Sequence, residues 1–197
     1  MNYRVVFALT SVVALSACGI NSVPTAEENA KAKWANAQAA YQRRADLIPN
    51  LQATVKGSAA SERQILTDVI TARSKATAIQ VTSNDLSDPA KMSQFAAAQG
   101  QLNGSLSRLL ATVEAYPDLK SQANFATFMQ QLEGTENRIN IAVLDYNTAV
   151  QAYNTRIRTF PDAVGAKIFY GAKPLVPFQA TTPGADKAPT VDFGNGN

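Results

Sequence analysis

The chain has 197 residues, 18 basic against 15 acidic side chains, and a formal net charge of +3 at neutral pH. This length suits a single domain, and the basic residues are scattered, so we expect no nucleic-acid partner. Histidine is absent, which excludes the commonest general base, the Ser-His and Cys-His nucleophile pairs, and the Glu-x-x-His ligands of ferritin-like bundles. We therefore predict a protein that is not an enzyme and that carries no cofactor and no metal.

Residues 1–17 are typical of a secretory signal peptide. A short cationic start ends at Arg4, and the apolar run over residues 5–14 is well under the roughly 20 residues needed to span a bilayer. The sequence Leu-Ser-Ala-Cys then follows at residues 15–18 and resembles the lipobox of bacterial lipoproteins. By that resemblance, the chain is cut before Cys18, whose thiol receives a diacylglyceryl group and whose new amino group can be acylated.

The alternative is an ordinary signal peptide cut nearby, with Cys18 left as a free thiol. Cys18 is the single cysteine of the chain, so it has no internal disulfide partner, and a free thiol is a liability in an oxidising compartment. We therefore expect a lipid anchor on Cys18, because two or three acyl chains attach a protein stably. The next residue is Gly19 rather than aspartate, which resembles lipoproteins sent to the periplasmic face of the outer membrane.

Heptad spacing of apolar residues predicts four helices over residues 25–160, after a polar tether over residues 18–24. Thr25 and Glu28 form a predicted capping box at the start of the first helix, which runs to about residue 56. A continuous helix over residues 26–80 would span about 80 Å, more than the next helix can cover. We therefore favour a turn near Gly57 and two antiparallel helices over a single bent one.

The third predicted helix begins with Asp88 as N-cap and Pro89 at its first position, and it stops at Tyr116-Pro117. The fourth and longest starts near Leu119 and closes at residues 160–161. Short connections between such helices predict an all-α, antiparallel up-and-down four-helix bundle with coiled-coil-like seams. The core predicted from these seams includes Leu51, Leu102, Leu109, Leu132 and Ile139.

Residues 161–197 differ from the rest of the chain. Five prolines exclude a helix through most of this region, yet side chains such as Ile168, Phe169 and Phe178 make it too apolar for a free linker. We predict an extended, proline-rich strap that lies across the bundle.

The densest unusual chemistry is the stretch Arg-Arg-Ala-Asp-Leu-Ile-Pro-Asn-Leu at residues 43–51. Its apolar stripe continues in register past Pro49, which predicts a kinked helix rather than a helix end. Arg44 falls on the seam. In one interpretation, Arg44 extends its charge out to water. In the other, Arg43 or Arg44 pairs with Glu136 and Asn137 across the bundle, and Asp46 orients the cation.

This stretch, followed by Thr-Val-Lys-Gly at residues 54–57, resembles the signature of the LemA family. The resemblance continues at residues 116–120, 135–139, 146–147, 153–155 and 188–193, and covers nearly all of the chain after residue 34. It implies an antiparallel helical bundle at a bacterial membrane, with no established enzymatic activity. Most relatives begin with a membrane-spanning helix, and this chain departs from them there. The candidate interaction or structural residues are Arg43, Arg44, Asp46, Asn50, Glu62, Glu136, Asn137, Tyr146, Asn147, Tyr153 and Asn154.

Three functions remain open at this point. The first is a lipid-anchored, non-enzymatic module of the bacterial cell envelope that binds or supports another envelope component, through an unidentified protein partner. The second is a carrier of a small molecule or metal that uses Arg44, Glu62 and Glu136. The third, a hydrolase built from carboxylates alone, would require Asp46, Glu62 and Glu136 around one cleft.

Overall fold

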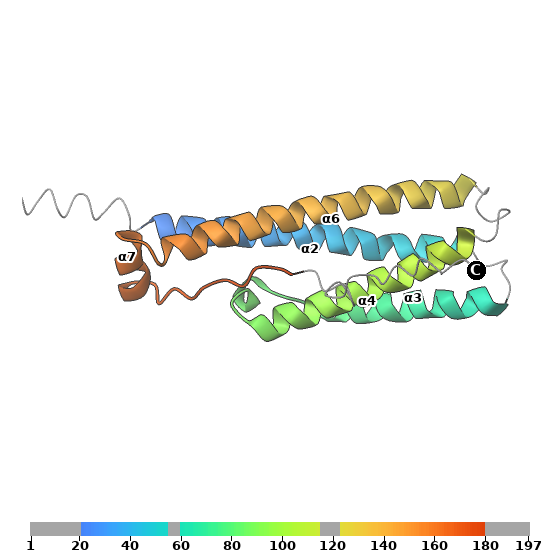
Figure 1. Ribbon diagram of the computed structural model, residues 1–197, viewed down its shortest axis with the longest axis horizontal. Helices are drawn as coiled ribbons and strands as arrows, with labels where there is room; N and C mark the ends of the chain where they lie inside the picture. The colour runs from blue at the N-terminus through green and yellow to red at the C-terminus, as the bar shows by residue number, and fades with distance from the viewer. Residues whose placement is uncertain (1–20, 55–59, 115–122, 180–197) are drawn as a thin grey trace, which may run out of the picture.

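The computed structural model describes residues 21–54, 60–114 and 123–179 (Figure 1). Within these ranges, side chains are described at all positions except residues 51–63 and 113–124. The helices are α2 (Ser22–Thr54), α3 (Ala60–Ala78), the 3₁₀ helix η1 (Ser83–Asp85), α4 (Pro89–Glu114), α6 (Ala123–Arg156) and α7 (Asp162–Ile168). No strand occurs within these ranges. The predicted all-α class is confirmed.

The four long helices form two antiparallel pairs. Helix α2 packs along α6, which comes much later in the sequence, and α3 packs along α4 (Figure 1). The pairs meet over a shorter stretch, where α2 contacts α3. Residues 26–80 thus form two helices of opposite direction, as the length argument predicted. Pro49 lies inside α2, so the helix does continue past it.

The start of α2 differs from the prediction. The helix begins at Ser22, and Thr25 is no N-cap, because its hydroxyl donates to the carbonyl of Asn21 within the first turn (2.7 Å). Pro24 also lies in that turn, where a helix needs no backbone N–H from it. Val23 is 1% exposed and belongs to the core, so its burial extends the helix into the region predicted as a tether.

The start of α4 agrees with the sequence. The Asp88 carboxylate accepts the backbone N–H groups of Ala90 (2.9 Å) and Lys91 (3.2 Å), and the helix begins at Pro89. Helix α6, in the other pair, stops at Arg156, a few residues before the predicted closure at residue 160.

The core consists of two hydrophobic clusters, one toward each end of the molecule. The first contains Trp34, Tyr41, Phe95, Tyr146, Tyr153 and Phe178, and the second contains Ile48, Leu102, Leu109, Phe125, Phe128 and Leu132, each with further members. Predicted core residues Leu102, Leu109, Leu132 and Ile139 are buried, and the Leu51 side chain lies outside those described. Between the clusters, Arg44, Gln99 and Thr135 are buried polar residues on α2, α4 and α6.

The region after residue 160 begins with a helix that the strap prediction did not include. Helix α7 follows Pro161, and its Gly165 and Ala166 are buried. The chain then turns at Gly171, whose φ of +53° is accessible to glycine at little cost. From there, residues 172–179 run without regular structure between the helix pairs (Figure 1). No described helix is both long and apolar enough to cross a membrane.

Candidate functional site

A single guanidinium joins the helices at the polar layer between the two clusters. Arg44 on α2 is 3% exposed; its Nη1 donates to Glu136 Oε1 on α6 (2.8 Å) and its Nη2 donates to Gln99 Oε1 on α4 (2.7 Å). The Gln99 amide in turn donates to the carbonyl of Ala76 on α3 (3.3 Å). All four long helices therefore meet around one buried cation.

The surroundings of Arg44 are suited to holding its charge away from bulk water. Glu136 supplies the compensating charge that a buried cation needs, and the Tyr41 ring centroid lies 5.3 Å from the guanidinium carbon, a cation–π distance. Burial raises the pKa of the Tyr41 phenol, so the ring stays neutral. Arg44 Nε is buried and has no hydrogen-bond acceptor among the described residues.

The predicted pair between an arginine and Glu136 is present, and it is made by Arg44. The alternative, in which Arg44 extends into water, is wrong. Arg43 and Asn137 are exposed, and Asp46 does not orient the cation, because it is exposed and accepts instead from the Gln42 amide (2.8 Å).

Gln99 was absent from the predicted site. The available signal was its place on the seam of the third helix, where every neighbouring seam residue is apolar. A buried amide at such a position needs a hydrogen-bonding partner. The sequence alone does not name that partner, because α2 and α4 are not adjacent in the chain.

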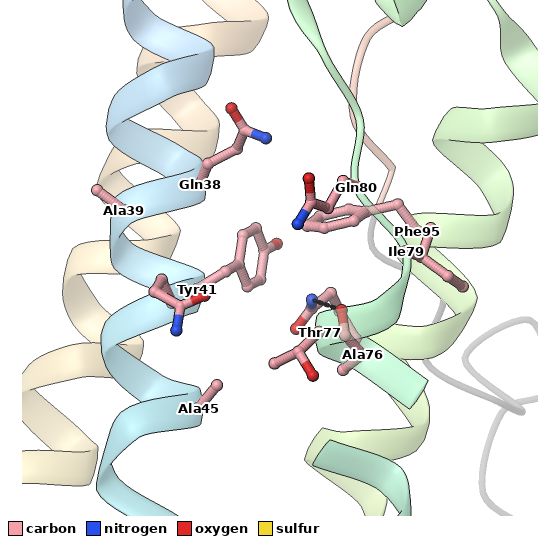
Figure 2. A pocket seen from close by; sticks show the side chains of 11 residues that line it. Gln38, Ala39, Tyr41, Ala45, Ala76, Thr77, Ile79, Gln80 and Phe95 are labelled. Carbon is pink, nitrogen blue, oxygen red and sulfur yellow. Dashed lines mark hydrogen bonds between the residues drawn. The ribbon is translucent and has the colours of Figure 1, made fainter. Parts of the chain in front are cut away.

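Two hollows flank Tyr41 and Gln99 where the helix pairs separate. The smaller, of about 300 Å³, lies between α2 and the end of α3. Figure 2 shows Tyr41 extending from α2 into this space, with Thr77, Gln80 and Phe95 opposite. The larger, of about 910 Å³, is lined mainly from α4, with further residues of α2, α3 and α6, and has Arg44 and Glu136 among its wall residues. We call it the α4–α6 groove.

A second group of polar side chains, on α6, binds the extended residues 172–179, which we call the strap. Asn154 on α6 donates to the carbonyl of Leu175 (2.8 Å) and accepts its N–H (2.9 Å). Asn147 does the same with the carbonyl (2.9 Å) and N–H (2.8 Å) of Phe178. Seven helical residues rise about 10.5 Å, which matches the roughly 10 Å spanned by three extended residues. The two asparagines therefore bind the strap backbone in a defined register.

The remaining contacts complete this attachment. The Tyr146 hydroxyl donates to the carbonyl of Val176 (2.9 Å), and the N–H of Val176 donates to the carbonyl of Leu86 in the α3–α4 connection (2.8 Å). Burial raises the pKa of Tyr146, which keeps it a neutral donor. Phe178 packs its ring against Trp34 (6.1 Å between centroids), and also against Tyr41 and Phe95.

The structure thus divides the predicted site residues into groups. Arg44 and Glu136 form the polar layer, while Tyr146, Asn147 and Asn154 bind the strap. Tyr153 is a core residue, 1% exposed, and burial raises its pKa. Arg43, Asp46, Asn50 and Asn137 are exposed, and Cys18 and the Glu62 side chain lie outside what the structure describes. Among the described residues, no three acidic or cysteine side chains gather as a metal site would require.

The sequence model of the LemA family matches residues 33–193, which include both polar sites. The chain belongs to the LemA family. It is 29% identical over 175 residues to Magnetosome protein MamQ 2 of Paramagnetospirillum magneticum, covering 79% of this chain and 64% of the relative. It is 26% identical over 172 residues to Magnetosome protein MamQ of Magnetospirillum gryphiswaldense, covering 79% and 63%.

A further relative is Protein LemA of Metamycoplasma hominis, 28% identical over 124 residues, which cover 62% of this chain and 52% of that protein. The chain spans less than two thirds of the length of each of these relatives. The family assignment therefore concerns the helical module that the polar layer and the strap hold together.

Replacing Glu136 with leucine should leave the buried Arg44 cation without its compensating charge and lower the free energy of unfolding by about 3–5 kcal/mol. Arg43→Met, which removes an exposed cation one residue away, should change it by no more than about 0.5 kcal/mol. Urea denaturation of both variants measures this. A double-mutant cycle of Arg44→Met and Glu136→Gln then isolates the pair, and coupling near zero would contradict the role given to it.

Replacing Asn154 with leucine should free the strap near Leu175, because the backbone N–H and carbonyl of that residue lose their partners. The expected loss is about 1–3 kcal/mol in the local opening free energy, seen as faster hydrogen exchange of the Leu175 amide. Asn140→Leu changes an exposed asparagine on the same helix and should leave that exchange rate unaltered. Equal rates in the two variants would show that the asparagine does not hold the strap.

Proposed function

We propose that this LemA-family chain is a membrane-anchored, non-enzymatic helical module of the bacterial cell envelope that binds or supports another envelope component. The observation that carries this proposal is the use of the family-like polar residues. Arg44 binds Glu136 within the α2–α6 pair and Gln99 of the other pair, and Asn147 and Asn154 bind the strap backbone. The hydrogen bonds of these residues are made within the chain, which explains these polar side chains without a substrate, except for Arg44 Nε.

The named relatives support the same kind of role. Two of them are called magnetosome proteins, and none of the three names states a reaction. A module that presents a rigid helical surface to a partner fits such a context. The partner proposed here is a protein of the envelope.

The proposed anchor is a lipid on Cys18, with the periplasmic face of the outer membrane as location. Its support is the short apolar run and the lipobox-like sequence at residues 15–18. Helix α2 begins at Ser22, so only three residues separate the acylated cysteine from the helical body. An extended chain of that length reaches about 14 Å at most, which would hold the end of the molecule near the bilayer.

Replacing Cys18 with alanine should abolish labelling by a fatty-acid probe and block cleavage at this site. Gly19→Ala, which keeps the thiol, should be labelled and cleaved like the native chain. Metabolic labelling followed by mass spectrometry of the mature N-terminus reads out both effects. A native N-terminus several residues away from Cys18, without an acyl group, would exclude the lipid anchor.

A contact surface for the partner is offered by the outer side of α6. Ile141 and Leu144 are large apolar residues there, 54% and 67% exposed. A photo-crosslinking side chain at Leu144 should capture one defined envelope protein in living cells, whereas the same group at the exposed Gln94 of α4 should not. The absence of any protein adduct at Leu144, or the same set of adducts from both positions, would count against this surface.

A second candidate function is the binding of a small molecule in the α4–α6 groove. It is favoured by the groove volume of about 910 Å³ and by the buried Arg44 Nε, which lacks an acceptor among the described residues. Native mass spectrometry of the purified chain distinguishes this candidate, because a bound molecule adds mass that Arg44→Met should remove.

A further inference from the structure

Exposed apolar side chains gather at one end of the molecule. Among the described residues, five of the seven large apolar side chains that are exposed lie within residues 160–170. They are Phe160 (86%), Val164 (49%), Ile168 (69%), Phe169 (66%) and Tyr170 (42%). Single exposed apolar residues are ordinary, whereas a cluster of this kind marks a site of interaction.

The short helix α7 explains how these side chains come to face outward. Gly165 and Ala166 are buried, and α7 contacts α2, so the small residues form the side that packs on the helix pair. Val164 and Ile168 are four residues apart and share the other face. Helix α7 therefore covers the end of the core with its small side and presents its bulky side to the surroundings.

Basic residues lie among and beside these apolar residues in the sequence. Residues 156–173 contain Arg156, Arg158, Lys167 and Lys173 and one acidic residue, Asp162. Asp162 lies 3.8 Å from Arg156 in an ion pair, which leaves Arg158, Lys167 and Lys173 as exposed cations beyond that pair. Apolar and aromatic side chains mixed with cations match the surface of an anionic bilayer, where the rings enter the interface and the cations meet the headgroups.

The place of this end in the chain points in the same direction. Figure 1 shows α7 at the same end of the molecule as the beginning of α2. Whatever holds the N-terminal part of the chain at a membrane would bring the α7 end toward the same surface.

We propose that the end of the molecule formed by residues 158–173 docks directly on an anionic lipid bilayer. This contact goes beyond the proposed lipid anchor and stands without it, since it uses side chains of the folded module. It orients the module with α7 at the bilayer. The 33 residues of α2 then carry the far end about 50 Å away, and the outer side of α6 stays open to a partner.

The experiment uses the purified full chain with a fluorescent amino acid in place of Phe169, added to vesicles of phosphatidylglycerol and phosphatidylethanolamine. The emission at position 169 should shift to the blue and be quenched by brominated acyl chains. The same probe at the exposed Leu144 of α6 should show neither effect. Vesicles of phosphatidylcholine alone should give weaker quenching at position 169.

A charge variant tests the headgroup contribution. Each cation near an anionic surface contributes about 1 kcal/mol, so the triple change Arg158→Gln, Lys167→Gln and Lys173→Gln should weaken partitioning of the unacylated chain roughly a hundredfold. The matched control Arg43→Gln, Lys75→Gln and Arg138→Gln removes the same charge from exposed positions elsewhere and should have a much smaller effect. Equal losses in the two triple variants would overturn the docking surface.

The outcomes separate this proposal from the lipid anchor. An acylated, vesicle-bound chain without quenching at position 169 overturns the docking surface and leaves the anchor in place. Quenching at position 169 of an unacylated chain supports the docking surface, and only a native chain found without acylation would remove the anchor. A photo-crosslinker at position 169 that captures a protein and no lipid in cells would also overturn it, in favour of a protein contact.

Discussion

The arrangement of the helices depends on the burial of the Arg44 cation. A buried guanidinium must be compensated, and here Glu136 and Gln99 do so from two other helices. One turn before Arg44, Tyr41 joins one hydrophobic cluster, and one turn after it, Ile48 joins the other. Apolar seams alone tolerate sliding by a turn, whereas a polar residue on the seam specifies register. The polar layer therefore sets how the helix pairs align.

The strap depends on that alignment. Phe178 packs against Trp34 and Tyr41 of α2 and against Phe95 of α4, so its contacts require these two helices to lie in this alignment. Asn147 and Asn154 form hydrogen bonds with backbone atoms of the strap, so this attachment to α6 does not depend on the side chains of the strap. The strap also contacts the α3–α4 connection, and thereby becomes a second link between the pairs.

The α7 end and the outer side of α6 expose different side chains, so the proposed bilayer contact and the proposed protein contact use different surfaces. The α7 end combines exposed rings and cations, while the outer side of α6 offers Ile141 and Leu144. A bilayer at the former and a protein partner at the latter would not compete for the same surface. The α4–α6 groove lies between the helix pairs, and its wall includes neither the exposed residues of the α7 end nor Ile141 and Leu144.

Local properties of the sequence determined the helices, their seams and the Asp88 cap, because heptad spacing and capping involve residues a few positions apart. The family-like motifs also identified Arg44, Glu136, Asn147 and Asn154 as candidate interaction or structural residues. Only the tertiary structure decided that α2 pairs with α6, that Gln99 is the second acceptor of Arg44, and that Asn154 binds Leu175. It also decided the early start of α2 and the presence of α7, where burial of Val23 and Ala166 prevails over weak local signals. The contacts of Gln99 with Arg44 and of Asn154 with Leu175 join residues 55 and 21 positions apart, and they follow from packing, which local spacing does not encode.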